Sequence, residues 1–152
     1  GDAVIIDIDH LHHVVTWLDG GLHPRGIGVT TAVLYLMLGE AQLADADTHF
    51  VYVAMNEVDA RHAQNLFVRM LCSEPGLELN RNQYQQIQLK HSGMVFFFVG
   101  LEYFTQRFAF TGTRINRIFT DLPGDLSTDQ QESLNTKLHI LQAHGADIIN
   151  GK

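Results

Sequence analysis

A chain of 152 residues and 17.1 kDa is close to the commonest size of a single domain. Hydrophobic residues make up 45% of it and charged residues 18%, a composition that excludes a disordered, solvating chain. We therefore expect one folded domain over residues 1–152. With 10 Lys+Arg against 17 Asp+Glu, the formal net charge of −7 disfavours non-specific binding to a phosphate backbone, so any nucleic-acid site must be local.

Membrane and disulfide signals are also missing from the sequence pattern. No apolar run approaches the roughly 18 to 20 residues that span a bilayer, so we expect no membrane partner. The lone cysteine, Cys72, excludes an internal disulfide and suits a reducing compartment, which makes the cytoplasm the expected location. Because Cys72 ends an amphipathic segment, we expect it to be a small buried apolar residue.

The first half of the chain alternates between helical and extended patterns. Apolar residues spaced by four and three predict a helix over 3–18, and glycines then predict a loop from Gly20 to Gly28. The segment 30–43 is apolar around most of its circumference, which predicts a helix buried on more than one face. A β-branched and aromatic strand is predicted over 49–55, followed by an amphipathic helix over 57–72.

The second half continues the same alternation. The Asn/Gln-rich stretch within 80–88 is interpreted as a polar surface segment, and the continuously apolar run 94–99 as a central strand covered on both faces. Strands are predicted over 87–89, 94–99 and 115–120, and helices over 101–108 and 127–143, the last capped by Ser127. Strands interleaved with helices predict an α/β domain of three layers, with a mainly parallel sheet flanked by helices.

The segment Arg25-Gly26-Ile27-Gly28-Val29-Thr30-Thr31-Ala32 is a glycine-rich loop that enters a helix. Glycines let backbone N–H groups converge on an anion, the helix N-terminus adds partial positive charge, and a threonine hydroxyl can bind magnesium. These residues resemble the phosphate-binding loop of P-loop NTPases, with Thr30 in the position of the magnesium ligand. His23 stands where the first glycine of the family pattern belongs, and Val29 stands where its lysine belongs.

A second motif lies downstream, where the apolar strand Arg117-Ile118-Phe119-Thr120 ends in Asp121. It resembles the Walker B strand of the same family, whose aspartate holds magnesium through water. Leu122 follows where ATP-hydrolysing members often have a glutamate. Together the segments are most similar to the RecA-like core of helicases and phage terminase ATPases, reduced in size.

The resemblance implies a nucleotide- or phosphate-binding set and an inactive catalytic centre. The set comprises Gly26, Gly28, Val29, Thr30, Thr31 and Asp121. Without the lysine and the adjacent glutamate, the loop is expected to be a degenerate Walker A loop that performs no hydrolysis. No cofactor is required by this reading, although the loop can retain ATP and Mg²⁺. The direct alternative is an active ATP-binding and ATP-hydrolysing P-loop enzyme.

The acidic and histidine-rich segment 7–13 offers two other interpretations. On a helix, Asp9, His10 and His13 share one face, and such ligands suit a divalent transition metal. Acids at a helix start and solvated histidines account for the same pattern, so we expect no metal site. If residues 4–6 formed a strand, Asp7 and Asp9 would resemble the first motif of haloacid-dehalogenase-like phosphatases, with Asp121 and Asp125 as magnesium ligands.

Basic and aromatic residues lie close together in the sequence between 103 and 117. Arg107, Arg114 and Arg117 occur near Tyr103 and three phenylalanines, Phe104, Phe108 and Phe110. Arginine pairs with phosphates and aromatic rings stack on unpaired bases, so the cluster predicts a single-stranded nucleic-acid site, although aromatics at these spacings also suit a core.

These observations lead to one expectation with three alternatives. We expect a degenerate P-loop-like domain of phage or other viral origin that acts as a nucleic-acid binding or assembly module, forms a homo-oligomer and works in the host cytoplasm. The alternatives are the active ATPase, a ligand-free oligomeric interaction protein and the phosphatase.

Overall fold

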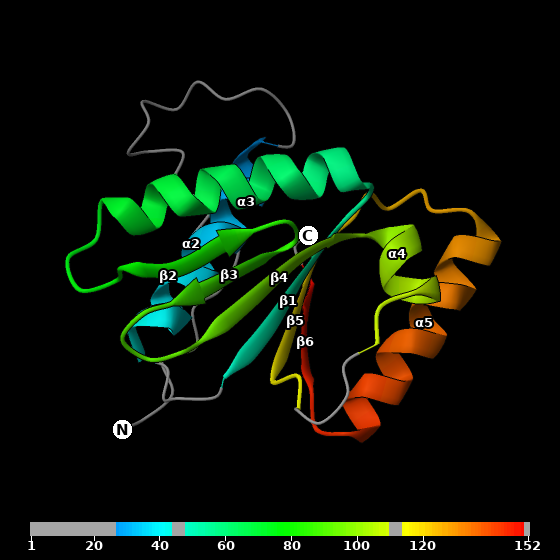
Figure 1. Ribbon diagram of the computed structural model, residues 1–152. Helices are drawn as coiled ribbons and strands as arrows, with labels where there is room; N and C mark the ends of the chain where they lie inside the picture. The colour runs from blue at the N-terminus through cyan, green and yellow to red at the C-terminus, as the bar shows by residue number, and fades with distance from the viewer. Residues whose placement is uncertain (1–26, 44–47, 110–113, 151–152) are drawn as a thin grey trace.

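A six-stranded sheet forms the centre of the computed structural model, which describes residues 27–43, 48–109 and 114–150 (Figure 1). The helices are α2 (Ile27–Leu43), α3 (Glu57–Cys72), α4 (Leu101–Gln106) and α5 (Thr128–Ala143). The strands are β1 (His49–Ala54), β2 (Leu79–Gln83), β3 (Gln86–Leu89), β4 (Val95–Gly100), β5 (Arg117–Asp121) and β6 (Asp147–Asn150).

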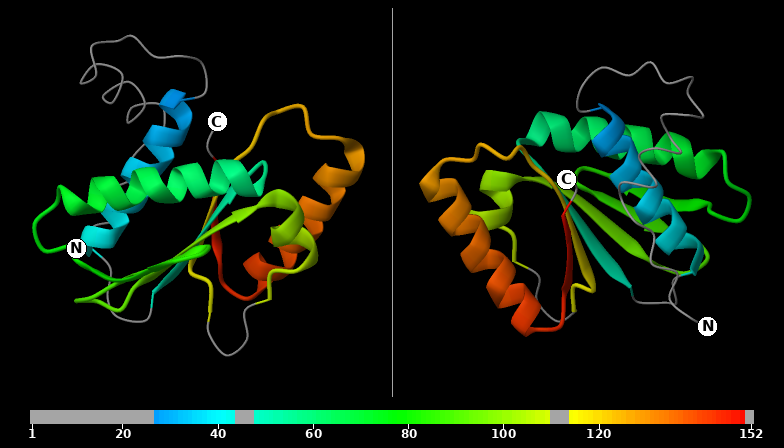
Figure 2. Two further views of the ribbon diagram at one scale, coloured as in Figure 1. Left: turned by 45° about the horizontal axis from the view of Figure 1, so that its top comes forward. Right: turned by 180° about the vertical axis from the view of Figure 1, so that it is seen from behind.

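The strand order is β2-β3-β4-β1-β5-β6, and the four strands from β4 to β6 are parallel to one another. β3 runs antiparallel to β4, and β2 runs antiparallel to β3, so a hairpin extends one side of the sheet. Helices lie on both faces (Figure 2). The predicted three-layer, mainly parallel α/β architecture is confirmed.

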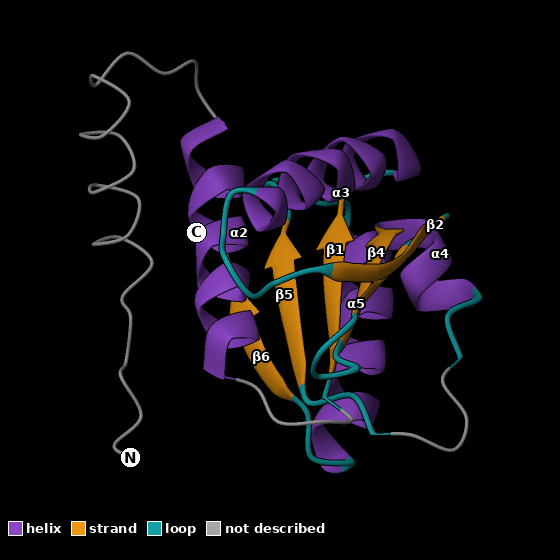
Figure 3. Ribbon diagram, turned by 60° about the vertical axis from the view of Figure 1, so that its left-hand side comes forward, coloured by secondary structure: helices purple, strands orange, loops and turns teal. Residues whose placement is uncertain are grey.

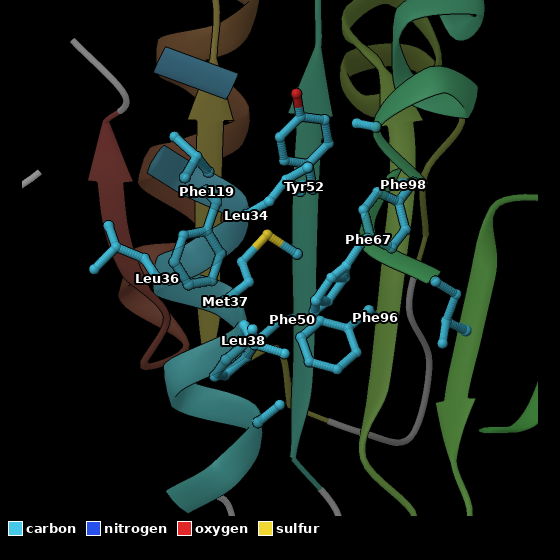
Figure 4. Packing of buried hydrophobic residues seen from close by; sticks show 14 of the residues in the cluster. Leu34, Leu36, Met37, Leu38, Phe50, Tyr52, Phe67, Phe96, Phe98 and Phe119 are labelled. Carbon is cyan, nitrogen blue, oxygen red and sulfur yellow. The ribbon is translucent and has the colours of Figure 1, made fainter. Parts of the chain in front are cut away.

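Alternation along the strands divides the core into two clusters. Phe50 and Tyr52 of β1 pack beneath α2 and α3, together with Phe67, Phe96 and Phe119 (Figure 4). Val51 and Val53 of the same strand point to the other face, where Leu134 of α5 and residues of α4 cover them. A sheet buried on both faces explains why β1 and β4 are so continuously apolar.

The helices begin and end where local chemistry favours it. Asn56 caps α3 by accepting a hydrogen bond from the Asp59 backbone N–H at 2.8 Å. Ser127 caps α5 in a reciprocal capping box with Gln130, which confirms the predicted cap. α2 is buried through Ala32, Val33, Leu34, Leu36, Met37 and Leu38, which confirms burial on more than one face.

Two strands were not predicted. β2 occupies part of the stretch interpreted as a polar surface segment, and it is an exposed edge strand with no buried face to produce an alternating pattern. β6 contains only two apolar residues, Ile148 and Ile149, which point to opposite faces of the sheet. Short edge strands give too few apolar positions for periodicity to detect.

Two further expectations are corrected. The loop expected to extend to Gly28 ends earlier, because α2 begins at Ile27 and includes that glycine in its first turn. Cys72 is exposed rather than buried. The buried face of α3 runs through Ala60, Ala63, Phe67 and Leu71, and the position after Leu71 is turned by about 100° away from that face.

The helix expected over 3–18 lies outside the described residues. Among the helices that are described, none combines the length and the hydropathy that a bilayer crossing requires.

Candidate functional site

Asp121 lies at the carboxyl end of β5 and joins three elements through hydrogen bonds. Thr30 Oγ1 of α2 donates to Asp121 Oδ2 at 2.5 Å, and the hydroxyl of Tyr52 in β1 donates to the same oxygen at 2.6 Å. Both are side-chain donors that can rotate. We refer to Thr30, Tyr52 and Asp121 as the hydroxyl cluster.

Tyr52 contributes to both the core and the hydroxyl cluster. Its ring is 1% exposed and packs on Phe98, with the ring centroids 5.5 Å apart. In Figure 4 its hydroxyl points along β1 toward the carboxyl end of the strand. Burial, followed by the nearby charge of Asp121 and their hydrogen bond, raises the pKa of the Tyr52 hydroxyl far above its usual value. Tyr52 is therefore a persistent hydrogen-bond donor to Asp121.

The hydroxyl cluster lies where the direction of chain connections reverses. From β1 the chain passes through α3 to strands on one side of the sheet, whereas from β5 it passes through α5 to β6 on the other side. α3 and α5 consequently cover opposite faces, as Figure 3 shows from the side. In open α/β sheets, ligands bind at the carboxyl ends of the strands at such a switch point.

The first turn of α2 supplies backbone donors beside the hydroxyl cluster. Gly28, Val29 and Thr30 lie within the first four residues of the helix, whose N–H groups have no intrahelical acceptor. The first turn contains no acidic residue. Thr30 and Asp121, predicted as parts of one phosphate site, are brought into direct contact, and Thr31 follows on the same helix.

Mg²⁺ prefers oxygen ligands, and the hydroxyl and carboxylate of the cluster match that preference. The described residues contain no group of three or more His, Cys, Asp or Glu side chains that could hold a metal ion. The cluster therefore supplies one carboxylate and two hydroxyl groups, and a bound cation would need phosphate or water oxygens to complete its coordination. Gly26, Asp7, Asp9, His10 and His13 lie outside the described residues.

The predicted nucleic-acid residues occupy three different places. Arg117 of β5 pairs with Glu40 of α2 and lies over the Phe50 ring, with its guanidinium carbon 6.0 Å from the ring centroid. Arg114 donates to the Gly145 carbonyl oxygen at 3.1 Å. Gly145 follows α5, which covers the face of the sheet opposite to α2. Of the neighbouring phenylalanines, Phe104 and Phe108 are buried in the core and Phe110 lies outside the described residues.

Arg107 and Tyr103 remain together. They line a surface pocket of about 400 Å³ with four residues from the carboxyl edge of the sheet and the β2–β3 turn: Glu57, Tyr84, Gln85 and Glu102. Arg107 has no ion-pair partner among residues 27–43, 48–109 and 114–150. This pocket brings one of the three predicted arginines next to two tyrosines, and it also contains two glutamates.

A second carboxylate at the carboxyl edge, Glu57, was missed by sequence reasoning. The Gly100 backbone N–H donates to its Oε1 at 2.8 Å, and the Gln85 side-chain amide donates to its Oε2 at 2.8 Å. We refer to Glu57, Gln85 and Gly100 as the hairpin clamp. The signal available in the sequence was a glutamate in the first turn of a helix, which is too common to identify a site.

Comparisons with known proteins reveal a shared fold. No family model matches the chain, and no curated protein matches its sequence. Among solved structures, the large terminase of bacteriophage HK97 matches with a TM-score of 0.63 and 15% identity, over 83% of this chain and 26% of that one. The large terminase of a thermophilic bacteriophage matches with a TM-score of 0.56 and 13% identity, over 83% of this chain and 31% of that one.

At these identities the likeness establishes the fold. This chain has an α/β fold similar to part of phage large terminases, and it spans about a quarter to a third of their length. The sequence had suggested a resemblance to phage terminases from the glycine-rich loop, the order of the predicted strands and helices, and the strand ending in Asp121. The structural likeness agrees with that expectation at the level of fold.

Proposed function

We propose that this chain is a phage-related, P-loop-like domain with a degenerate nucleotide site, acting as a single-stranded nucleic-acid binding or assembly module. The observation that carries the proposal is the hydrogen bond between Thr30 Oγ1 and Asp121 Oδ2, beside the first turn of α2. A hydroxyl at a helix N-terminus and an aspartate at the end of a central strand are the two magnesium-handling groups that the P-loop resemblance implies. The similarity of fold to large terminases also supports the proposal.

Loss of hydrolysis follows from the residues beside these two groups. Phosphoryl transfer depends on positive charge positioned at the oxygens where negative charge develops. Val29 supplies an apolar side chain where the family places lysine, and Leu122 follows Asp121 where a catalytic glutamate is common. The site thus lacks both the charge on the outer phosphates and the group that activates water.

Weak nucleotide binding remains compatible with the site. The N–H groups of the first turn of α2 have no acceptor within the helix and favour a phosphate, and Thr30 and Asp121 would contact its magnesium ion. Binding must first separate the Thr30 hydroxyl from Asp121, which costs part of the binding free energy. We therefore expect at most weak binding of magnesium nucleotides and no turnover.

The test is release of phosphate from Mg²⁺-ATP by the purified chain, with Thr30→Ala and Asp121→Asn as matched variants. All three proteins are expected to release phosphate at the same background rate. Turnover that Thr30→Ala or Asp121→Asn abolishes would instead establish the active ATPase.

The nucleic-acid part of the proposal is supported by the pocket that contains Arg107 and Tyr103. Arg107 is free to contact phosphate, and aromatic side chains near it can stack on bases exposed only in single strands. Fluorescence anisotropy at low salt should show tighter binding to single strands than to duplex of the same length. Absence of binding, together with a stable oligomer in sedimentation, would favour the ligand-free assembly protein.

A further inference from the structure

A polar pocket of about 210 Å³ lies between the first turns of α3 and the tip of the β2–β3 hairpin. Its lining comprises Glu57, Arg61, Gln64, Asn65, Asn82, Gln83, Tyr84, Gln85 and Phe98. The volume is below the roughly 300–1,000 Å³ of sites for drug-sized ligands, so the pocket suits one planar fragment. It shares three lining residues with the pocket of Arg107 and Tyr103, so the two lie on either side of the hairpin tip.

Tyr84 provides an exposed aromatic surface at the hairpin tip. Its side chain is 63% exposed, although large aromatic side chains are usually buried. The guanidinium carbon of Arg61 lies 4.9 Å from its ring centroid, in a cation–π contact. Arg61 has no ion-pair partner in the described part of the chain. An unpaired arginine beside an exposed ring is suited to a ligand with both a π face and a nearby phosphate.

Gln64 brings an unsatisfied hydrogen-bond acceptor to the same pocket. Its residue is 7% exposed, and its Nε2 lies 2.7 Å from the Gln83 carbonyl oxygen and 3.1 Å from Asn82 Oδ1. Its Oε1 accepts no hydrogen bond from any described residue. A buried acceptor without a donor is costly, and a ligand carrying an N–H group would remove that cost.

The hairpin tip is held in place before any ligand binds. Gln85 has φ of 65°, a left-handed conformation that usually requires Gly or Asn in a two-residue turn. Its side-chain amide donates to Glu57 Oε2, and its carbonyl oxygen accepts the Phe98 N–H at 2.9 Å. A fixed turn lowers the entropy lost when Tyr84 stacks on a ligand.

We propose that this pocket binds one unpaired base of single-stranded nucleic acid. The base stacks on Tyr84 and donates an N–H hydrogen bond to Gln64 Oε1, while Arg61 and, on the other side of the tip, Arg107 contact the flanking phosphates. Glu57 lines both pockets, and its negative charge repels phosphate from the interior of the base pocket, so a neutral base fits there better than an anion. The inference rests on the proposed nucleic-acid function and names where its base specificity resides.

The experiment measures fluorescence anisotropy with labelled oligonucleotides of about 12 nucleotides, within the usual range of single-strand site sizes. The probes are oligo-dA, oligo-rA, a duplex, and an abasic strand of equal length that keeps the phosphates but lacks bases. The proteins are wild type, Tyr84→Ala, Tyr84→Phe and the control Tyr35→Ala, which removes another exposed tyrosine, from α2. Circular dichroism checks that each variant is folded.

Oligo-dA or oligo-rA should bind at least about ten-fold more tightly than the abasic strand. Tyr84→Ala should weaken binding by about five- to a hundred-fold, the range for losing one stacked base, whereas Tyr84→Phe and Tyr35→Ala should bind as wild type does. If the abasic strand bound as tightly as oligo-dA and oligo-rA, or if Tyr84→Ala bound as tightly as wild type, the base pocket would be overturned. The proposed nucleic-acid function would not be contradicted by either result. No single-strand binding by wild type would overturn both.

Discussion

Two carboxylates at the carboxyl edge of the sheet, Asp121 and Glu57, are held in contrasting ways. Asp121 accepts hydrogen bonds from the side-chain hydroxyls of Thr30 and Tyr52, which come from two different elements. Glu57 accepts from the Gly100 backbone N–H and from the Gln85 amide, both at 2.8 Å, and its bond from the Tyr84 hydroxyl is longer, at 3.5 Å. Hydroxyls can rotate to new acceptors, whereas a backbone N–H at the end of a strand cannot move away from its place.

The contrast separates a carboxylate that can exchange partners from one that fixes architecture. At Gly100 an added Cβ would lie 2.7 Å from the backbone of both Asn56 and Glu57, so β4 and the start of α3 touch through their main chains. The two hydrogen bonds to Asp121 Oδ2 come from side-chain hydroxyls instead. The hydroxyl cluster is therefore suited to receive a ligand, and the hairpin clamp to position the hairpin.

The largest effect is expected at the hairpin clamp, from Gly100→Ala. The new methyl group would meet backbone atoms that cannot turn aside, so unfolding free energy should fall by about 3 kcal/mol. Urea denaturation measures the change. Gly124→Ala is the matched control, because nothing lies within 4 Å of its Cβ position, and it should stay within about 0.5 kcal/mol of wild type. A Gly100→Ala variant as stable as the control would contradict the close packing.

The hydroxyl cluster should respond less strongly, because one donor remains when the other is lost. Tyr52→Phe removes one hydrogen bond to Asp121 while keeping the ring in the core, and should lower the unfolding free energy by about 1.5 kcal/mol. Tyr103→Phe serves as control, since the Tyr103 hydroxyl has no hydrogen-bond partner among the described residues. Equal losses in both variants would show that the Tyr52 hydroxyl is not held by Asp121.

Alkaline pH should reveal the same hydrogen bond by a different route. The pKa of Tyr52 is raised in the folded state, so above the unfolded value of about 10 the unfolded chain releases a proton that the folded chain keeps. The contribution of the protonated Tyr52 hydroxyl to the unfolding free energy is complete below about pH 10. It is lost as the pH rises toward the folded pKa, by up to about 1.4 kcal/mol per pH unit. Tyr52→Phe should show a shallower decline than wild type between pH 10 and 11 in urea titrations. If the unfolding free energies of wild type and Tyr52→Phe declined in parallel, the raised pKa of Tyr52 would be contradicted.

The sequence predicted one of these two regions better than the other. Thr30 and Asp121 were singled out because a glycine-rich helix start and an acid after an apolar strand are recognisable patterns, and the structure brings them together. Tyr52 was missed because an aromatic residue inside an apolar strand looks like core, and its ring is indeed core. Only the position of its hydroxyl at the strand end gives it a second role.

The hairpin clamp left no comparable pattern in the sequence. Its two-residue turn has Tyr84 and Gln85 where Asn-Gly is the usual signal, and β2 is polar along its exposed length. Gln85 adopts its left-handed conformation because Glu57, 28 positions earlier, holds its side chain. Contacts between distant segments of this kind cannot be derived from local periodicity.

The smallest effect is expected from removing the charge of Glu57. In Glu57→Gln the side-chain oxygen still accepts the Gly100 N–H, and the losses are the bond from Gln85 and the long, exposed bond from the Tyr84 hydroxyl. We expect a loss of about 0.5 kcal/mol in unfolding free energy, against about 1 kcal/mol for Asp121→Asn, where two hydroxyls lose a charged acceptor. Both are measured in parallel by urea denaturation. If Glu57→Gln proved the more damaging of the two, the charge of Glu57 rather than its geometry would hold the hairpin, and the distinction between an exchangeable and an architectural carboxylate would fail.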